Sequence, residues 1–145
     1  MPNNNCIFRK LTADDYAKYV TLINDFRETV FTEEEFITTL GKMNANNSNI
    51  WVMVMNDELI ATGTIFYEYK FIHNISKLAH IEDICVSTYH RKNNYGKTMV
   101  KHLVEEAKKE KCYKITLYCD EKLEHFYADN GFEKKGIQMA IYNKL

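Results

Sequence analysis

Apolar positions along the chain recur with two different spacings, and these predict alternating strands and helices. Spacings of three and four predict helices at residues 12–25, 32–43, 95–111 and 123–129. Alternating or short continuous apolar runs predict strands at residues 6–11, 50–55, 59–69, 78–87, 113–119 and 132–142. This order predicts an α/β (α+β) fold, a mixed sheet with helices packed on it.

Local signals mark where several of these elements begin. Thr32 and Glu35 lie three apart and form a capping box at the start of the second predicted helix. Thr12 is a candidate cap for the first helix, and the acidic residues that follow it suit the positive end of the helix dipole. Residues 56–58 predict a hairpin turn between two strands.

Composition excludes several classes of protein. The 145 residues suit one domain, residues 1–145, and 46% hydrophobic with 27% charged residues is typical of a globular chain. A formal net charge of −1 gives no overall basic footprint for nucleic acid. The first ten residues resemble no targeting peptide, and the longest apolar run, residues 50–55, is too short to span a membrane. We therefore expect a cytoplasmic protein.

Cysteine spacing does not predict a metal centre. The chain contains no CxxC pair, and its cysteine spacings match no zinc module. We expect reduced, mostly buried thiols and no metal cofactor. The cysteines are Cys6, Cys85, Cys112 and Cys119.

A polar and basic stretch connects the predicted strand at residues 78–87 to the long helix that starts near residue 95. It contains Arg91, Lys92, Gly96 and Lys97. Backbone amides at a helix N-terminus, beside basic side chains, suit a pyrophosphate group. A single glycine is a weak signal, and an ordinary polar connection is the alternative.

Charged residues interrupt two apolar segments before that loop. Glu82 and Asp83 are adjacent in a predicted strand and so point to opposite faces. At least one of them needs a partner, either a polar substrate or a structural cation. Lys70 and His73, three apart in a loop, suit a phosphate group; the alternative is that both are ordinary surface residues.

An aromatic stretch follows the predicted strand at residues 113–119. Asp120 comes directly after that strand, and Tyr127 lies on the short helix that follows. A phenol at such a place can donate a proton to a leaving group. Alternatively, Phe126, Tyr127 and Phe132 are core aromatics.

Taken together, these stretches resemble the GNAT superfamily of acetyl-CoA-dependent N-acetyltransferases, and within it the glucosamine 6-phosphate N-acetyltransferases. The resemblance covers about residues 8–142. The loop before the long helix is a signal of the superfamily only. The subfamily is indicated by Lys70-Phe-Ile-His73, His80-Ile-Glu-Asp-Ile84, Cys112-Tyr-Lys-Ile115 and Cys119-Asp-Glu-Lys122 with Phe126-Tyr127 and Gly131-Phe132.

The resemblance implies a fold, a reaction and an assembly. The fold is GNAT-type, a mixed and mostly antiparallel central sheet flanked by helices. The reaction transfers the acetyl group of acetyl-CoA to the amine of D-glucosamine 6-phosphate, by direct attack without a covalent enzyme intermediate. The product enters UDP-N-acetylglucosamine biosynthesis. The implied assembly is a homodimer with the substrate site close to the subunit interface.

The resemblance also implies which residues act. Tyr127 protonates the CoA thiolate, the backbone around Asp120 positions the amine, and Asp83 holds it. Amides near residues 84–86 stabilise the oxyanion. The implied substrate-binding residues are Arg27, Lys70, His73, Glu82, Asp83 and Ile84. The implied acetyl-CoA-binding residues are Ile84, Cys85, Val86, Arg91, Lys92, Asn93, Asn94, Tyr95, Gly96, Lys97 and Tyr127.

The chain departs from the family pattern at three places. Lys92 and Asn94 replace two loop glycines, and asparagine tolerates left-handed backbone better than lysine does. Leu123 lies near a position where the family often has an asparagine that helps to hold the cofactor. The usual threonine before the second helix and the C-terminal basic residue are not aligned clearly, and Arg27 is the candidate to replace their phosphate contact.

Two other functions stay open at this point. The chain is a GNAT enzyme for another amine, such as a polyamine, an aminoglycoside or a peptide N-terminus, or it is a non-catalytic acyl-CoA-binding module. A cationic acceptor favours an acidic cleft, whereas Arg27, Lys70 and His73 favour an anionic acceptor. Tyr127 with the paired carboxylates argues against a non-catalytic module.

Overall fold

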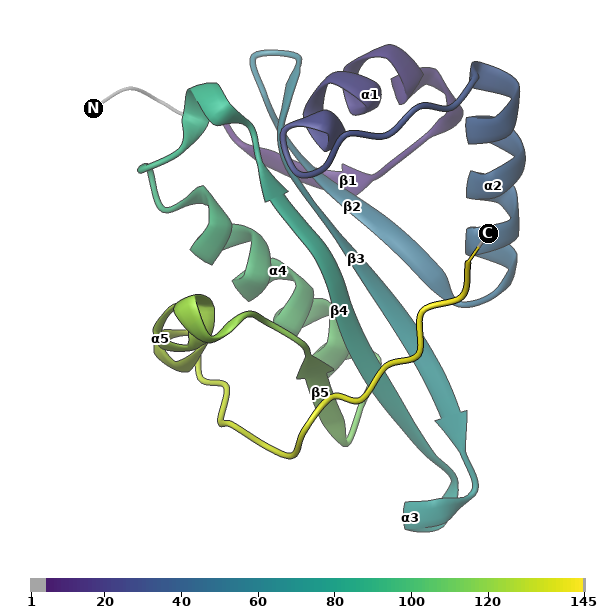
Figure 1. Ribbon diagram of the computed structural model, residues 1–145, viewed down its shortest axis with the longest axis vertical. Coiled ribbons are helices and arrows are strands. Elements are labelled where there is room, and N and C mark those ends of the chain that lie inside the picture. Colours follow the sequence, from purple (N-terminus) through teal and green to yellow (C-terminus); the bar gives the residue numbers. More distant parts are fainter. Residues whose placement is uncertain (1–4, 145) are drawn as a thin grey trace.

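The computed structural model describes residues 5–144 and is built around a five-stranded sheet (Figure 1). The strands lie side by side in chain order, and all neighbours are antiparallel except β4 and β5, which are parallel. The predicted mixed, mostly antiparallel sheet is therefore confirmed. The strands are β1 (Ile7–Lys10), β2 (Ser48–Met55), β3 (Glu58–Lys70), β4 (Ser76–Val86) and β5 (Lys114–Leu117).

Helices cover both faces of this sheet. The apolar sides of α1 and α2 pack on one face, and α4 packs on the other. The helices are α1 (Tyr16–Asn24), α2 (Glu33–Ala45), α3 (Ile72–Ile75), α4 (Tyr95–Lys109) and α5 (Glu124–Asp129), with short 3-10 turns η1 (Ala13–Asp15), η2 (Thr88–His90) and η3 (Glu121–Leu123). Within residues 5–144, no helix is both long and apolar enough to cross a membrane.

The alternation of strand residues creates two cores. In β2, Val52 and Val54 face α1 and α2, whereas Met53 between them packs with residues of α4. Four residues of the apolar stripe of α4 are fully buried: Met99, Val100, Leu103 and Ala107. These burials remove large apolar surfaces from water and fix the sheet between its helices.

Local capping and turn signals are confirmed. The Glu35 amide donates to Thr32 Oγ1 at 3.1 Å, and the Thr32 amide donates to Glu35 Oε2 at 2.7 Å. Asn56 and Asp57 form the turn between β2 and β3 with φ of 49° and 61°, the left-handed backbone of tight hairpins. These features depend only on neighbours in the sequence.

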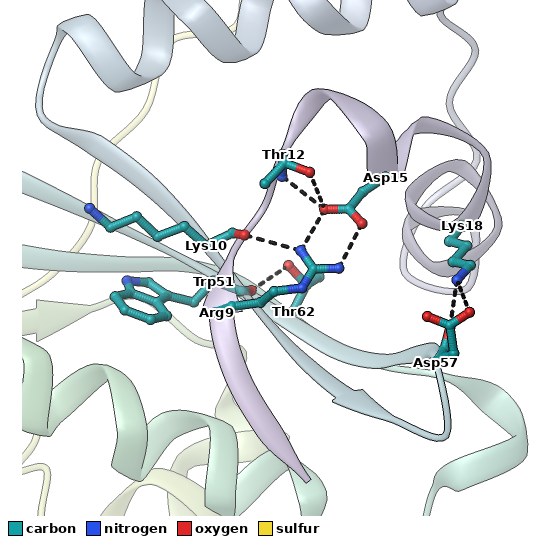
Figure 2. A network of polar contacts seen from close by, with 8 residues as sticks. All are labelled: Arg9, Lys10, Thr12, Asp15, Lys18, Trp51, Asp57 and Thr62. Carbon is teal, nitrogen blue, oxygen red and sulfur yellow. Dashed lines mark hydrogen bonds and ion pairs between the residues drawn. The ribbon is translucent and has the colours of Figure 1, made fainter.

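A part-buried ion pair connects β1 to the turn that starts the first helix (Figure 2). The Arg9 guanidinium donates to both oxygens of Asp15, at 2.7 and 2.8 Å, and the Thr12 amide also donates to this carboxylate. The bond with Arg9 holds the pKa of Asp15 below its usual value. Asp15 is thus a structural anchor and more than a dipole partner, which its spacing alone did not reveal.

Residues 132–142 correct the prediction of a last strand. They form no strand, and Ile137, Met139 and Ile141 are at least 90% exposed. The alternating apolar pattern is real, but a strand needs a neighbour, and within residues 5–144 this segment pairs with none.

Substituting His102 tests one buried polar group of α4. Its ring stacks on Phe8 at 4.2 Å and lies edge-on to Trp51, and Nε2 is buried with no hydrogen-bond partner among the described residues. Burial lowers the pKa of His102, and Glu106 opposes this effect. Because the unfolded chain binds this proton more tightly, stability falls as pH drops through the ordinary histidine pKa, near 6.5.

We expect the substitution His102→Phe to keep the stacking and to remove this pH-dependent loss. Between about pH 7.5 and pH 5.5 the Tm of the variant should fall less than that of the unaltered protein. Thermal melts across this range measure it, with exposed His125→Phe as the control. Equal slopes for all three proteins would contradict the prediction.

Candidate active site

The sheet opens where β4 and β5 part. Their parallel pairing runs from Leu78 and Lys114 to Ile81 and Leu117 and then stops, while β4 continues to Val86. Two adjoining cavities lie beside this last part of β4. They share Val86, Arg91, Gly96 and Phe126. A molecule bound there would contact β4, α4 and α5 together.

The first cavity, of about 360 Å³, lies at the N-terminus of α4. Its lining includes Arg91, Lys92 and Lys97 against one carboxylate, Asp129. The helix N-terminus adds the positive end of a dipole and the amides of its first turn, which includes Gly96. This arrangement has the charge and the donors that a pyrophosphate needs.

The loop before α4 closes without its two expected glycines. Lys92 adopts φ of 70° and Asn94 adopts φ of 61°, so both keep the left-handed backbone that glycine would supply. For a lysine this conformation costs about 1–2 kcal/mol. The Asn93 amide group donates to the His90 and Arg91 carbonyls, which holds the turn from inside.

Arg91 fixes the start of this loop. Its Nε donates to the Val86 carbonyl at 3.3 Å, and its Nη2 donates to the Asp25 carbonyl at 3.1 Å. The Asp25 carboxylate in turn accepts from the Thr88 amide at 2.9 Å. The end of α1, the end of β4 and the loop are therefore held together around the cavities.

The second cavity, of about 350 Å³, is more apolar in its lining. Ile84, Cys85 and Val86 of β4 line one side, and Tyr127 lines another. An apolar cavity that also offers the Tyr127 phenol and the backbone of a strand suits an acyl thioester. The sequence-predicted residues of the acetyl end and those of the pyrophosphate end thus meet in adjoining cavities.

Tyr127 is half-buried on α5 between two other aromatic rings. The Phe126 and Phe132 rings meet it edge to face, with centroids at 4.9 and 6.0 Å. Burial, with a smaller effect of Cys119, raises the pKa of Tyr127. The phenol therefore keeps its proton at neutral pH and is available as a donor.

Cys85 is not an activated nucleophile. Its side chain is buried, and Sγ donates to the Leu22 carbonyl at 3.4 Å. Burial raises the pKa of this thiol to about 11, so it is not a thiolate at neutral pH. Within residues 5–144, no group of three or more metal-ligating side chains gathers.

Glu82 and Asp83 lie at an irregularity of β4. Thr64 pairs with Glu82, but Thr62 pairs with Cys85, so β4 has one extra residue there. Asp83 carries the strain, with φ of 52°. Both side chains are exposed, so the expectation that at least one of them needs a structural partner is wrong. Partial desolvation, and then the charge of Asp83, raise the pKa of Glu82. The two carboxylates directly precede Ile84, which lines the second cavity.

Lys70 and His73 lie far from these carboxylates in the same chain. Lys70 pairs with Ser76 at the tip of the β3–β4 hairpin. Ser76 lies six residues before Glu82 on β4, so Lys70 and Glu82 are about 20 Å apart along the strand. Lys70 Nζ contacts Glu68 at 2.9 Å, and the His73 ring packs against Tyr113. The structure does not bring these two residues to the cavities.

Other expected residues lie nearer. Arg27 is exposed and directly follows Phe26, which lines the second cavity. Asp120 is exposed between β5 and η3, where its carbonyl accepts from the Leu123 amide. Neither side chain lines a cavity.

Sequence reasoning missed some lining residues. Asp25, His90, Phe126, Asp129 and Asn130 line the cavities. The sequence pattern indicated other positions for them: Asp25 and Asp129 at helix ends, His90 in a connecting loop, Phe126 in the core and Asn130 in a helix cap. Only the folded chain, which brings the end of α1, η2 and α5 to the end of β4, places them at the cavities.

Comparison with known proteins finds relatives over most of the chain. The model of the acetyltransferase (GNAT) family matches residues 16–132. The chain is 37% identical over 140 residues to glucosamine 6-phosphate N-acetyltransferase 1 of Dictyostelium discoideum, covering 93% of this chain and 89% of that protein. It is 33% identical to glucosamine 6-phosphate N-acetyltransferase 1 of Oryza sativa subsp. japonica, covering 90% and 82%.

A solved structure shows the same architecture. The crystal structure of glucosamine-6-phosphate N-acetyltransferase from Arabidopsis thaliana superposes with a TM-score of 0.90 at 31% identity, covering 97% of this chain and 99% of that one. The resemblance indicated by the sequence motifs is therefore confirmed over nearly the whole chain. The chain belongs to the acetyltransferase (GNAT) family.

Proposed function

We propose that this chain, as a single domain, transfers the acetyl group of acetyl-CoA to the amine of D-glucosamine 6-phosphate. The observation that carries the proposal is the pair of adjoining cavities at the β4–β5 opening. One is basic and lies at a helix N-terminus, and the other is apolar and holds a protonated phenol. Relatives named for this reaction support the choice of acceptor.

In the proposed mechanism, the first cavity binds the pyrophosphate of acetyl-CoA and the second holds its acetyl group. Arg91 to Lys97 bind the pyrophosphate through backbone amides and cationic side chains. The acetyl group lies beside residues 84–86, whose amides stabilise the oxyanion. The neutral amine forms a bond to the carbonyl carbon, the carbon–sulfur bond breaks, and Tyr127 protonates the thiolate. The nitrogen loses its proton to solvent, and Tyr127 recovers one from solvent.

The acceptor would lie over the irregular part of β4. Glu82 and Asp83 are the nearest carboxylates to Ile84 in the chain and suit the sugar hydroxyls and the amine. The Asp120 backbone is proposed to help position the amine, and Arg27 to approach the phosphate. Holding amine and thioester together supplies most of the rate enhancement.

The distance of Lys70 and His73 supports a homodimer in which they act on the partner subunit's substrate. Two exposed apolar surfaces support the same assembly. The hairpin tip exposes Phe71, Ile72 and Ile75, and the segment at residues 137–142 exposes an alternating apolar face. Unpaired strand-like segments and apolar patches of this kind favour association with a second copy.

Subunit mixing tests the shared site. Lys70→Ala and Tyr127→Phe, each weak as a homodimer, should regain activity when mixed, because hybrid dimers contain one complete site. Exchange to equilibrium should restore about one quarter of wild-type activity on glucosamine 6-phosphate. No recovery, with hybrid dimers present by mass spectrometry, would place Lys70 in the same subunit's site or outside it.

Turnover tests the reaction itself. Release of CoA thiol from acetyl-CoA should require an amino-sugar 6-phosphate and should be slow with polyamines, aminoglycosides or peptides. Better turnover of a polyamine would support the alternative acceptor, and binding of acetyl-CoA without turnover of any amine would support a non-catalytic module. The proposal also places the enzyme in the cytoplasm and its product in UDP-N-acetylglucosamine biosynthesis.

A further inference from the structure

Gly63 of β3 faces the irregular part of β4. The ladder pairs Thr64 with Glu82 and Thr62 with Cys85, so Gly63 alone opposes both Asp83 and Ile84. Such a bulge disrupts the ladder locally and redirects the backbone of the longer strand. Here it lies where Ile84 begins the wall of the second cavity.

Space, and not backbone conformation, distinguishes glycine from other residues at this position. Gly63 is buried, and its φ is not in the left-handed range. A Cβ placed on it would lie 2.7 Å from Ile84 Cδ1 and 2.7 Å from Leu103 Cδ1. The ends of the Ile84 and Leu103 side chains therefore occupy the space that a Cβ at residue 63 would need. The Ile84 side chain lies between β3 and α4.

This packing connects a side chain on one face to the backbone at the cavity. The Ile84 side chain is anchored against Gly63 and α4. Asp83 before it is turned into left-handed backbone, with φ of 52°. The direction of the backbone amides after the bulge therefore depends on how far the Ile84 side chain can enter the space between Gly63 and α4.

We propose that Gly63 is a positioning residue for acetyl transfer: it leaves the room in which Ile84 anchors the bulge, and so it aims the adjacent amides at the thioester carbonyl. The inference rests on the proposed function, because it assumes that acetyl-CoA occupies the second cavity. The pyrophosphate end is held by α4 and its loop, so Gly63 acts on the chemical step more than on cofactor affinity.

The substitution Gly63→Ala tests this role. The added methyl group pushes the Ile84 side chain outward, and kcat should fall roughly ten- to a hundredfold, the effect of a misaimed reacting group. The KM for acetyl-CoA should stay within about threefold, since its pyrophosphate contacts are distant. A kcat within about threefold of wild type would overturn the proposal.

Two double variants separate positioning from general packing. Gly63→Ala with Ile84→Val removes one close contact, at the bulge, and should restore kcat to near that of Ile84→Val alone. Gly63→Ala with Leu103→Val removes the other close contact, on α4. Compared with Gly63→Ala alone, this double variant should have a higher Tm but an equally low kcat. Equal recovery of kcat in both would overturn the proposal.

A further variant tests the role of Ile84 if Gly63→Ala does not fold. Ile84→Ala, made in the chain that keeps Gly63, must lower kcat, and an unchanged kcat would overturn the proposal.

A spectroscopic readout separates this inference from the choice of acceptor. The carbonyl infrared band of isotope-labelled acetyl-CoA should shift to lower frequency when it binds the unaltered protein, because aimed amides polarise the bond. The shift should be lost in Gly63→Ala. A shift without turnover of glucosamine 6-phosphate would leave Gly63 supported and the acceptor wrong, whereas no shift in the unaltered protein would overturn the role of Gly63.

Discussion

The substitution Tyr127→Phe should lower kcat by roughly ten- to a thousandfold, which overlaps the roughly hundred- to ten-thousandfold contribution of general acid–base catalysis. The phenyl ring keeps the edge-to-face contacts with Phe126 and Phe132, so the cavity wall should stay in place. Only the proton donor for the thiolate is removed. Because that proton matters in the transition state, affinity for acetyl-CoA should hardly change.

Steady-state kinetics from about pH 6 to pH 9, with calorimetric titration of acetyl-CoA, measure both parts of this prediction. Burial raises the pKa of Tyr127, so ionisation of this phenol should not limit the unaltered enzyme within that range. Tyr89→Phe, at an exposed tyrosine outside both cavities, is the matched control. Wild-type turnover by Tyr127→Phe across the range would remove its catalytic role.

Preference for the phosphorylated sugar is the second large effect. Lys70, His73 and Arg27 are proposed to contact the 6-phosphate, and a charge-assisted hydrogen bond contributes about 1.5–3 kcal/mol. Two such contacts imply a preference of at least about a hundredfold in kcat/KM for glucosamine 6-phosphate over glucosamine. Lys70→Ala should remove much of this preference and leave turnover of unphosphorylated glucosamine nearly unchanged.

Kinetics with both sugars check the prediction, with Lys101→Ala on the exposed side of α4 as the control. Lys70 contacts Glu68, so the phosphate must compete with that carboxylate. For this reason Glu68→Gln should keep or increase the preference. Equal rates on both sugars would contradict the phosphate assignment but would leave the fold and the proposed acetyl-CoA site in place.

Sequence alone was sufficient wherever the determining contacts are local. The capping box of Thr32 and Glu35, the turn at Asn56 and Asp57 and the apolar stripe of α4 each involve residues within a few positions of one another. Periodicity therefore predicted a mixed sheet with helices packed on it, and short motifs predicted the family. The basic loop before α4 was identified because a strand end, a turn and a helix start are contiguous in the chain.

Tertiary structure decided the features that depend on distant segments. The parting of β4 from β5 places Tyr127 and Ile84 in the walls of one cavity, and the bulge opposite Gly63 and the roughly 20 Å between Lys70 and Glu82 follow from the register of β3 and β4. Residues 137–142 show the limit of a pattern: alternation specifies which side chains share a face, but a strand also requires a neighbouring backbone to bond. Whether that neighbour exists depends on the surrounding backbone and not on the segment's own residues.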